Sequence, residues 1–374
     1  MQRKWVWPIL VVLLCVTVLS PYGYWYYKKP VPLKALILDK TVPVADYREH
    51  KGLMWILNNL KLTRDREGNS FRYAQDYYGF FPLSRDNYDI RDIPSNSGKL
   101  DLIYLADSYG VYTDDFYTDN VRGDRSELMY GGLSGDDVTK ITKALGPKTV
   151  LVAEFNILAS PTGSEARHRM EKLLGVEWQA WTGRYFTDLD PGNSELPTWL
   201  IRNYERQYKT AWKFKGPGFA YVSSADRVVI LRVGQEVGGR GLVIQFKPTA
   251  AQEFGIKDSV PFYYWFDVVQ AQPGTEVLGE YHLDVTPKGQ KLLAKFGLPT
   301  DFPAVLRKNS PSTSYYFAGD FADNSQVPER WNYAATPYIR RLLVNDIEGS
   351  QNMFFWNMYY PLVARIAGGA VHAQ

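Results

Sequence analysis

The chain has 374 residues, with 43 Lys and Arg against 40 Asp and Glu, so its net charge is +3. Charges of both signs are interspersed and form no basic stripe of the kind that a phosphate backbone requires, so we expect no nucleic-acid partner. The single cysteine, Cys15, excludes a disulfide framework and a cysteine metal site from the rest of the chain.

An uncharged apolar segment from Trp5 to Tyr27 comes first in chain order. It is long enough to cross the hydrocarbon core of a bilayer, and the aromatic rings near its end suit the headgroup level. We therefore predict a transmembrane anchor. A cleaved signal peptide is the alternative, in which Arg3 and Lys4 form the basic start and the cut follows Ser20.

The charges beside this segment do not decide its orientation. Arg3 and Lys4 before it are matched by Lys28 and Lys29 after it, so the positive-inside bias nearly cancels. A very short flank before a long domain resembles a signal anchor. We therefore expect a single-pass protein of the cell membrane whose body lies outside the cytoplasm.

Three short apolar runs follow, and each precedes a helical pattern. Strands are expected at residues 33–39, 100–106 and 149–153, and helices at 46–60, 134–145 and 164–174. This alternation predicts an α/β fold built on an open, mostly parallel sheet with helices on both faces.

After about Gly175 the pattern changes to strands and turns, and the last candidate strand ends in the acidic pair Asp320 and Asp323. We expect three parts in the chain: the anchor over 1–29, an α/β domain over 30–190 and a β-rich region over 191–374. The β-rich region either completes the first sheet or adds a layer to it.

An apolar segment near the C-terminus, residues 354–366, is too short and too interrupted for a second membrane span. We expect it to pack on the body. The alternative is an amphipathic helix that lies on the membrane beside the anchor.

Polar residues follow the three predicted strands of the α/β domain, where open parallel sheets bind their ligands. These candidate site residues are Asp39, Lys40, Asp107, Ser108, Tyr109, Glu154 and Asn156. Arg184 and Tyr185, soon after the third strand and helix, are expected to close the site from the side.

Asp107 and Glu154 are the candidate catalytic residues. Two carboxyls at neighbouring strand ends can divide acid and base roles when burial raises the pKa of one of them. The alternative is a structural role, in which they cap helices or bind Arg184 and Lys40. The four histidines lack metal-ligand spacing, so we predict no metal site and no cofactor.

The 27 Tyr, 11 Trp and 18 Phe residues are an unusual aromatic content. Residues 178–185 place two indoles, a guanidinium and a phenol close together, as a carbohydrate cleft would. Ordinary packing of rings in a large core explains the same pattern.

The order of these elements resembles the class I glutamine amidotransferase-like family, on the segments Asp107–Gly110, Gly131–Gly132 and Glu154–Asn156. The resemblance implies a flavodoxin-like α/β sheet. Active members carry a cysteine nucleophile at a sharp turn between strand and helix. The corresponding turn here, Ala153–Asn156, has no thiol, so we expect no amidotransferase chemistry.

These features together predict a membrane-anchored binding or scaffold protein in cell-envelope carbohydrate handling, with a carbohydrate or an envelope protein as its partner. The alternative is a carboxylate-dependent hydrolase of envelope glycans, in which Glu154 and Asp107 act as acid and base.

Overall fold

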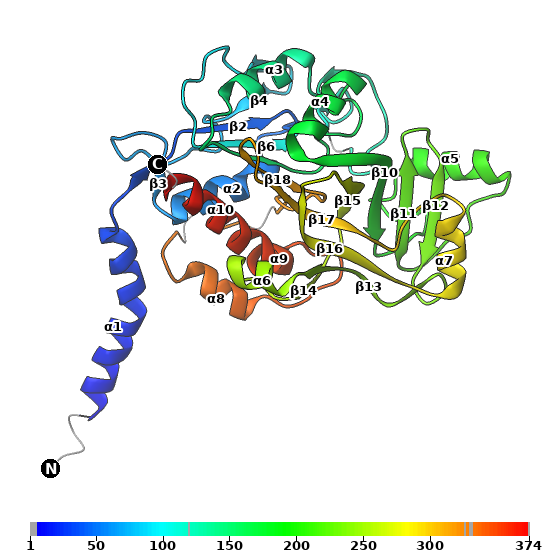
Figure 1. Cartoon of the computed structure of the whole chain (residues 1–374). Coiled ribbons are helices and arrows are strands. Elements are labelled where there is room, and N and C mark those ends of the chain that lie inside the picture. Colours follow the sequence, from blue (N-terminus) through cyan, green and yellow to red (C-terminus); the bar gives the residue numbers. More distant parts are fainter. Residues whose placement is uncertain (1–5, 119, 325–326, 329–331, 373–374) are drawn as a thin grey trace.

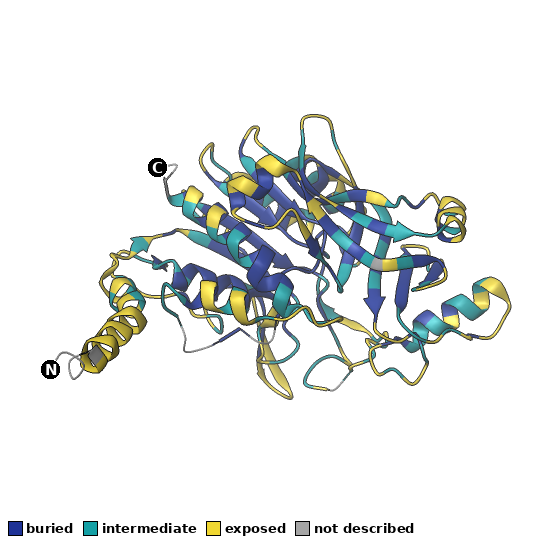
Figure 2. Ribbon diagram, turned by 90° about the horizontal axis from the view of Figure 1, so that it is seen from below, coloured by how far each residue is buried: buried dark blue, intermediate teal, exposed yellow. Residues whose placement is uncertain are grey.

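The computed structural model describes residues 6–118, 120–324, 327–328 and 332–372 (Figure 1). Its first element, α1 (Val6–Tyr27), projects from the body and is exposed except near its end, where Pro21, Gly23 and Trp25 are half-buried (Figures 1 and 2). Among the described residues, α1 is the one helix long and apolar enough to cross a membrane. A signal sequence shares these properties, and the basic start at Arg3 and Lys4 lies outside the described residues.

The end of α1 contacts the end of α2 (Arg48–Asn59). The Trp25 indole donates a hydrogen bond to the Asn59 carbonyl oxygen at 2.8 Å, and the Lys28 ammonium donates to the Leu60 carbonyl at 2.9 Å. The Lys61 ammonium lies 3.8 Å from the centroid of the Trp25 ring. These contacts fix the point at which α1 leaves the body.

The main sheet has ten strands in the described residues, in the order β14-β13-β16-β17-β18-β9-β6-β2-β4-β5. Its strands are β2 (Ala35–Asp39), β4 (Tyr78–Ser84), β5 (Asn87–Arg91), β6 (Leu102–Asp107), β9 (Val150–Ala153), β13 (Val237–Phe246), β14 (Ser259–Pro261), β16 (Glu276–Val285), β17 (Asp301–Lys308) and β18 (Thr313–Phe317). The three strands predicted for the α/β domain are confirmed as β2, β6 and β9.

The prediction of a mostly parallel sheet needs correction, because the sheet is mixed. Only the central run β18-β9-β6-β2-β4 is parallel, and the strands on either side pair antiparallel. Unlike parallel neighbours, antiparallel neighbours need no crossover helix between them. The alternation of strand and helix in the sequence therefore predicted only the parallel central run of the sheet.

Helices cover both faces of the parallel run. In Figure 1, α3 (Gly135–Ala144) and α4 (Ser164–Leu174) lie above it, and α2 and α10 (Tyr360–His372) lie below it. The predicted helices are therefore confirmed. Ser134 caps α3 through a reciprocal pair of hydrogen bonds with Asp137, and Gly175 ends α4 in the left-handed conformation at φ 73°.

A second sheet has the order β12-β11-β10-β15. Its strands are β10 (Val176–Phe186), β11 (Gly218–Ser223), β12 (Val228–Arg232) and β15 (Trp265–Ala271). The β-rich residues therefore do both things that the sequence left open: they complete the main sheet and they add a layer. Because β10 pairs with β11 and β15, this sheet spans the predicted boundary at residue 190.

The segment near the C-terminus forms α9 (Asn352–Phe354), the π-helical turn η2 (Phe355–Tyr359) and α10. Phe355, Trp356 and Tyr359 are fully buried, so the expected packing on the body is confirmed. The remaining elements are β1 (Val31–Pro32), β3 (Leu62–Thr63), β7 (Val111–Tyr112), β8 (Leu128–Tyr130), α5 (Thr198–Tyr208), α6 (Pro248–Phe254), α7 (Pro287–Ala294) and α8 (Thr336–Leu343).

Candidate functional site

The predicted strand ends meet at one edge of the main sheet. Asp39 ends β2, Asp107 ends β6, and the two residues are partners in the parallel register. Glu154 directly follows β9, and its amide donates to the Leu105 carbonyl of β6. The tertiary structure thus brings together the carboxyls that the sequence placed at the carboxyl ends of three strands.

Asp107 is the centre of a hydrogen-bond network at this edge. Its carboxylate accepts from the Thr41 hydroxyl at 2.5 Å, the Tyr109 amide at 2.5 Å and the Asn156 side-chain amide at 3.1 Å. Asn156 has a left-handed backbone, with φ 66°. Burial raises the pKa of Asp107 to about 7, with a contribution from the charge of Asp39, although the three donors act against this rise.

Asp39 binds a residue that the sequence did not single out as a site residue, His50 of α2. The two ring nitrogens of His50 lie 2.5 Å from the Asp39 carboxylate and 2.7 Å from the Tyr73 carbonyl oxygen. Both Asp39 and His50 are fully buried. The detectable signal was a histidine on the apolar face of a helix, one turn before Met54.

Lys40 and Ser108 bind neighbouring parts of the protein. The Lys40 ammonium donates to the Asp137 carboxylate at 2.8 Å and to the Gly132 carbonyl at 2.9 Å, which ties β2 to the start of α3. The Ser108 hydroxyl donates to the Asn156 carbonyl at 2.9 Å. These two predicted ligand-binding residues therefore already have partners within the fold.

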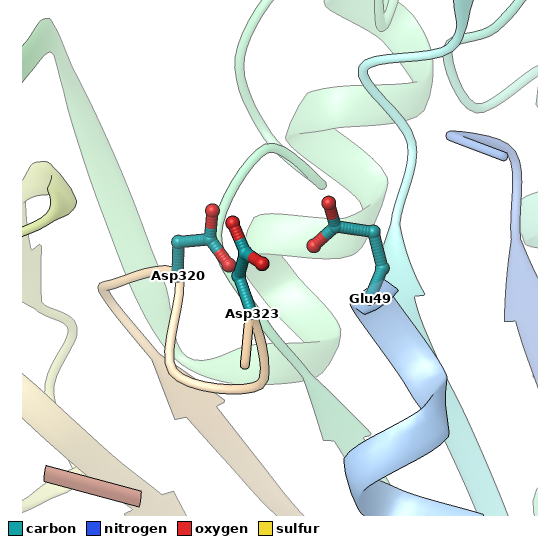
Figure 3. Close-up of side chains that lie close together, drawn as sticks. All are labelled: Glu49, Asp320 and Asp323. Atoms are coloured by element: carbon teal, nitrogen blue, oxygen red, sulfur yellow. The ribbon is translucent and has the colours of Figure 1, made fainter. Parts of the chain in front are cut away.

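Three carboxylates, Glu49, Asp320 and Asp323, form what we call the carboxylate centre (Figure 3). Glu49 lies in the first turn of α2, and the two aspartates lie on the loop after β18. Each offers an oxygen atom within 4.8 Å of the others, and all three residues are buried. The Arg48 guanidinium lies 3.1 Å from Glu49 and 3.7 Å from Asp323.

Clustering of like charges makes this centre electrostatically unusual. Burial raises the pKa of Glu49 well above its ordinary value, and the charges of Asp320 and Asp323 raise it further. The pKa of Asp320 is raised in the same way, first by burial and then by Asp323 and Asp107. Because Arg48 is the cation that offsets both, the arrangement favours a shared proton or a bound cation.

The sequence predicted no metal site, whereas the carboxylate centre has the oxygen ligands that hard divalent cations prefer. The sequence signal for this centre was the acidic pair Asp320 and Asp323. Like Asp39 and Asp107, this pair comes at the carboxyl end of a predicted strand. Glu49 could not be added from the sequence, because it comes from a helix 271 residues away from Asp320 along the chain.

Glu154 supports the loop that carries two of these carboxylates. Its side chain accepts hydrogen bonds from the hydroxyls of Tyr104 and Tyr359, the latter at 3.1 Å, and from the Ala322 amide at 3.2 Å. Burial raises the pKa of Glu154 to about 8 against the effect of these donors. Both Glu154 and Asp107 raise the pKa of Asp320, so the predicted acid and base act on the same neighbour.

Arg184 and Tyr185, which the sequence placed at the side of the site, differ in their surroundings. The Arg184 guanidinium lies 5.1 Å from the centroid of the Tyr264 ring. Tyr264 in turn interacts electrostatically with Asp323 of the centre and with Arg48 beside it. The Tyr185 hydroxyl instead donates to Glu348. Arg184 is therefore linked to the carboxylate centre through one aromatic ring.

The indoles of residues 178–185 are core groups. Trp178 and Trp181 are buried, and the Trp178 indole donates to the Asp267 carboxylate at 3.1 Å. The packing alternative for this aromatic stretch is thus confirmed for its two tryptophans. Three rings lie beside the Arg184 guanidinium, those of Phe186 at 4.8 Å, Tyr264 at 5.1 Å and Trp265 at 5.3 Å.

These contacts describe a buried, acidic centre at the strand ends, with Arg48 against it and Arg184 close by. No protein-family model matches the chain, and the comparison with curated proteins found no match.

Proposed function

We propose that the chain is a membrane-anchored binding protein whose body lies outside the cytoplasm, and that a carbohydrate of the cell envelope binds at the carboxylate centre. The helix α1 supports the anchoring by its length and composition. The observation that carries the binding proposal is the convergence of Glu49, Asp320 and Asp323 beside one guanidinium.

The chemistry of the centre suits a ligand rich in hydroxyl groups. Carboxylates accept hydrogen bonds from hydroxyls, the Arg48 guanidinium donates hydrogen bonds to oxygen atoms, and charged partners strengthen both kinds of bond. The Tyr264 ring supplies an apolar surface next to these polar groups. The proposal includes the resemblance to the class I glutamine amidotransferase-like family, which implies a ligand at the carboxyl ends of the parallel strands.

A second candidate is a carboxylate-dependent hydrolase of envelope glycans. The observation in its favour is that Asp107, with its pKa raised to about 7, neighbours the acidic centre. A carboxyl that titrates near neutral pH can donate and accept protons under physiological conditions. The two candidates share one ligand class and differ in whether a glycosidic bond is broken.

The test uses the full-length protein in lipid nanodiscs and an array of envelope glycans. We expect a glycan to bind, and Asp320→Asn to weaken its binding by about 1 to 3 kcal/mol. Asp258→Asn is the matched control, because Asp258 is exposed and lies outside the centre. Equal binding by Asp320→Asn and the control would exclude this site.

The same samples distinguish binding from hydrolysis. Incubation with the bound glycan should leave it intact if the protein only binds. Release of cleaved products that Asp107→Asn slows by about 10² to 10⁴ would instead establish the hydrolase.

A further inference from the structure

The helix α8 presents an apolar strip that no described part of the protein covers. Its side chains Tyr338, Ile339, Leu342 and Leu343 are 71%, 41%, 85% and 70% exposed. They lie on one face, because residues four apart are neighbours on a helix. So much contiguous apolar surface on a short helix is typical of a contact with a partner or a membrane.

The opposite side of α8 is held by the body. Thr336 and Pro337 are buried, and the Arg341 guanidinium donates to the Gly255 carbonyl at 3.3 Å. The next loop is also attached, because Glu348 accepts a hydrogen bond from Tyr185. The apolar strip is thus presented outward by a helix that both of its flanks fix in place.

The start of α8 lies close to the point where α1 leaves the body. Asn59 accepts from the Trp25 indole through its carbonyl oxygen and donates through its side chain to the Tyr333 carbonyl at 3.0 Å. Tyr333 comes three residues before α8, and the Tyr360 hydroxyl donates to the same Asn59 side chain at 2.9 Å. In Figure 1, α1 leaves the left edge of the body and runs downward, and α8 lies at the lower edge of the body.

We propose that α8 lies in the interfacial layer of the bilayer that α1 crosses, with its apolar strip among the upper parts of the acyl chains. This inference rests on the membrane anchoring proposed above. Trp25 and the tyrosines at the end of α1 have the residue types that occupy the headgroup level, and Asn59 connects that level to α8.

The composition of α8 fits a lipid surface. Arg340 lies beside the strip, and a basic residue beside an apolar face is attracted to anionic headgroups. Because α1 already holds the body at the membrane, the insertion of α8 is intramolecular and needs little binding energy of its own. The docked helix therefore orients the body against the bilayer and keeps it from swinging freely on its anchor.

The test uses the single cysteine of the full-length protein in nanodiscs, labelled with an environment-sensitive fluorophore. Three variants are compared: the natural chain labelled at Cys15, Cys15→Ser with Leu342→Cys, and Cys15→Ser with Lys291→Cys. Lys291 lies exposed on α7 and serves as the control. The lipids carry a nitroxide quencher either near the headgroup or near the end of the acyl chain.

We expect loss of fluorescence at Cys15 with the deep quencher, loss at residue 342 with the shallow quencher, and no loss at residue 291. A Cys15 label that lipid does not quench would remove the anchoring and the α8 proposal together. Quenching at Cys15 but not at residue 342 would overturn the α8 proposal alone, and Leu343→Cys repeats the measurement one position along. If the emission of the label at residue 342 shifts to the blue but neither lipid quencher reduces it, a second copy of the chain covers the strip and the α8 proposal is wrong.

Discussion

At the residue scale, the fold tolerates buried carboxyls in two different ways. Asp39 lies beside an imidazole ring, whereas Glu154 has neutral donors, the two tyrosine hydroxyls and the backbone amides of Phe321 and Ala322. Burial disfavours the ionised form of a carboxyl, and neutral donors offset only part of that cost. The pKa of Glu154 is accordingly raised to about 8, which makes this residue a pH-sensitive part of the fold.

We predict that Glu154→Gln makes stability less dependent on pH. The carboxyl titrates near pH 4.5 in the unfolded chain and near pH 8 in the folded protein. Between these values the native state binds more protons than the unfolded state, so the free energy of unfolding falls as pH rises. Each unit of pKa shift corresponds to about 1.4 kcal/mol. The free energy of unfolding that is lost between the two pKa values is therefore several kcal/mol at most.

Thermal unfolding of the full-length protein in detergent between pH 5 and 9 measures this effect. Glu154→Gln should unfold at a higher temperature than the natural chain at pH 8 and above, and the two should converge towards pH 5. Glu165→Gln, at an exposed position on α4, should follow the natural chain throughout. Parallel curves for Glu154→Gln and the natural chain would show that Glu154 is ionised in the fold at all these pH values.

At the element scale, α2 connects the candidate site to α1. Its first turn carries Arg48, Glu49 and His50, and its last residue, Asn59, accepts the hydrogen bond from Trp25. In its middle, Gly52 packs directly against the ring of Phe355 in η2. The position of α2 therefore depends on a contact that leaves no room for a side chain.

We predict that Gly52→Ala destabilises the protein by about 1 to 3 kcal/mol, the usual cost of overpacking a core. A Cβ atom at this position would lie 2.7 Å from a ring carbon of Phe355, which is itself fully buried. This cost exceeds the gain of about 0.5 to 1 kcal/mol that alanine gives over glycine inside a helix.

Gly369→Ala in α10 is the matched control, because a Cβ atom there would meet nothing within 4 Å. It should stabilise the protein slightly. Denaturant unfolding of both variants in the full-length protein decides the matter, and a Gly52→Ala variant as stable as Gly369→Ala would mean that α2 and η2 can move apart at no cost.

At the scale of the whole molecule, the apolar helix and the body are joined by hydrogen bonds from Trp25 and Lys28. A chain that keeps this helix in the membrane holds the body close to the bilayer. The side of the membrane on which the body lies then decides which ligands can reach the carboxylate centre.

We predict that protease added to intact cells digests the body, while the anchor stays uncleaved in the membrane. This outcome follows from the proposed topology, in which α1 stays in the bilayer and the body lies outside the cytoplasm. A tag at the C-terminus, immunoblotting and N-terminal sequencing of the mature chain provide the measurement, with a cytoplasmic protein as the protected control. A mature chain that begins near Pro21 would contradict the anchor, and a body protected until lysis would contradict the orientation.

The sequence by itself determined the features that depend on neighbouring residues: the apolar helix α1, the strands β2, β6 and β9, and the helices that follow them. Periodicity and hydrophobicity are local, so these elements and the polar residues at their ends could be predicted. Asp39, Asp107 and Glu154 were placed at one edge for that reason, and they do lie there.

Only the tertiary structure decided how the two halves of the chain combine. The pairing of β18 with β9 brings the loop with Asp320 and Asp323 to the parallel strand ends, and the packing of α2 adds Glu49. No local pattern specifies such long-range pairing, because each strand can satisfy its hydrogen bonds with more than one neighbour. Burial then raised the pKa values of these carboxyls, since desolvation depends on the surrounding atoms and not on the sequence beside them.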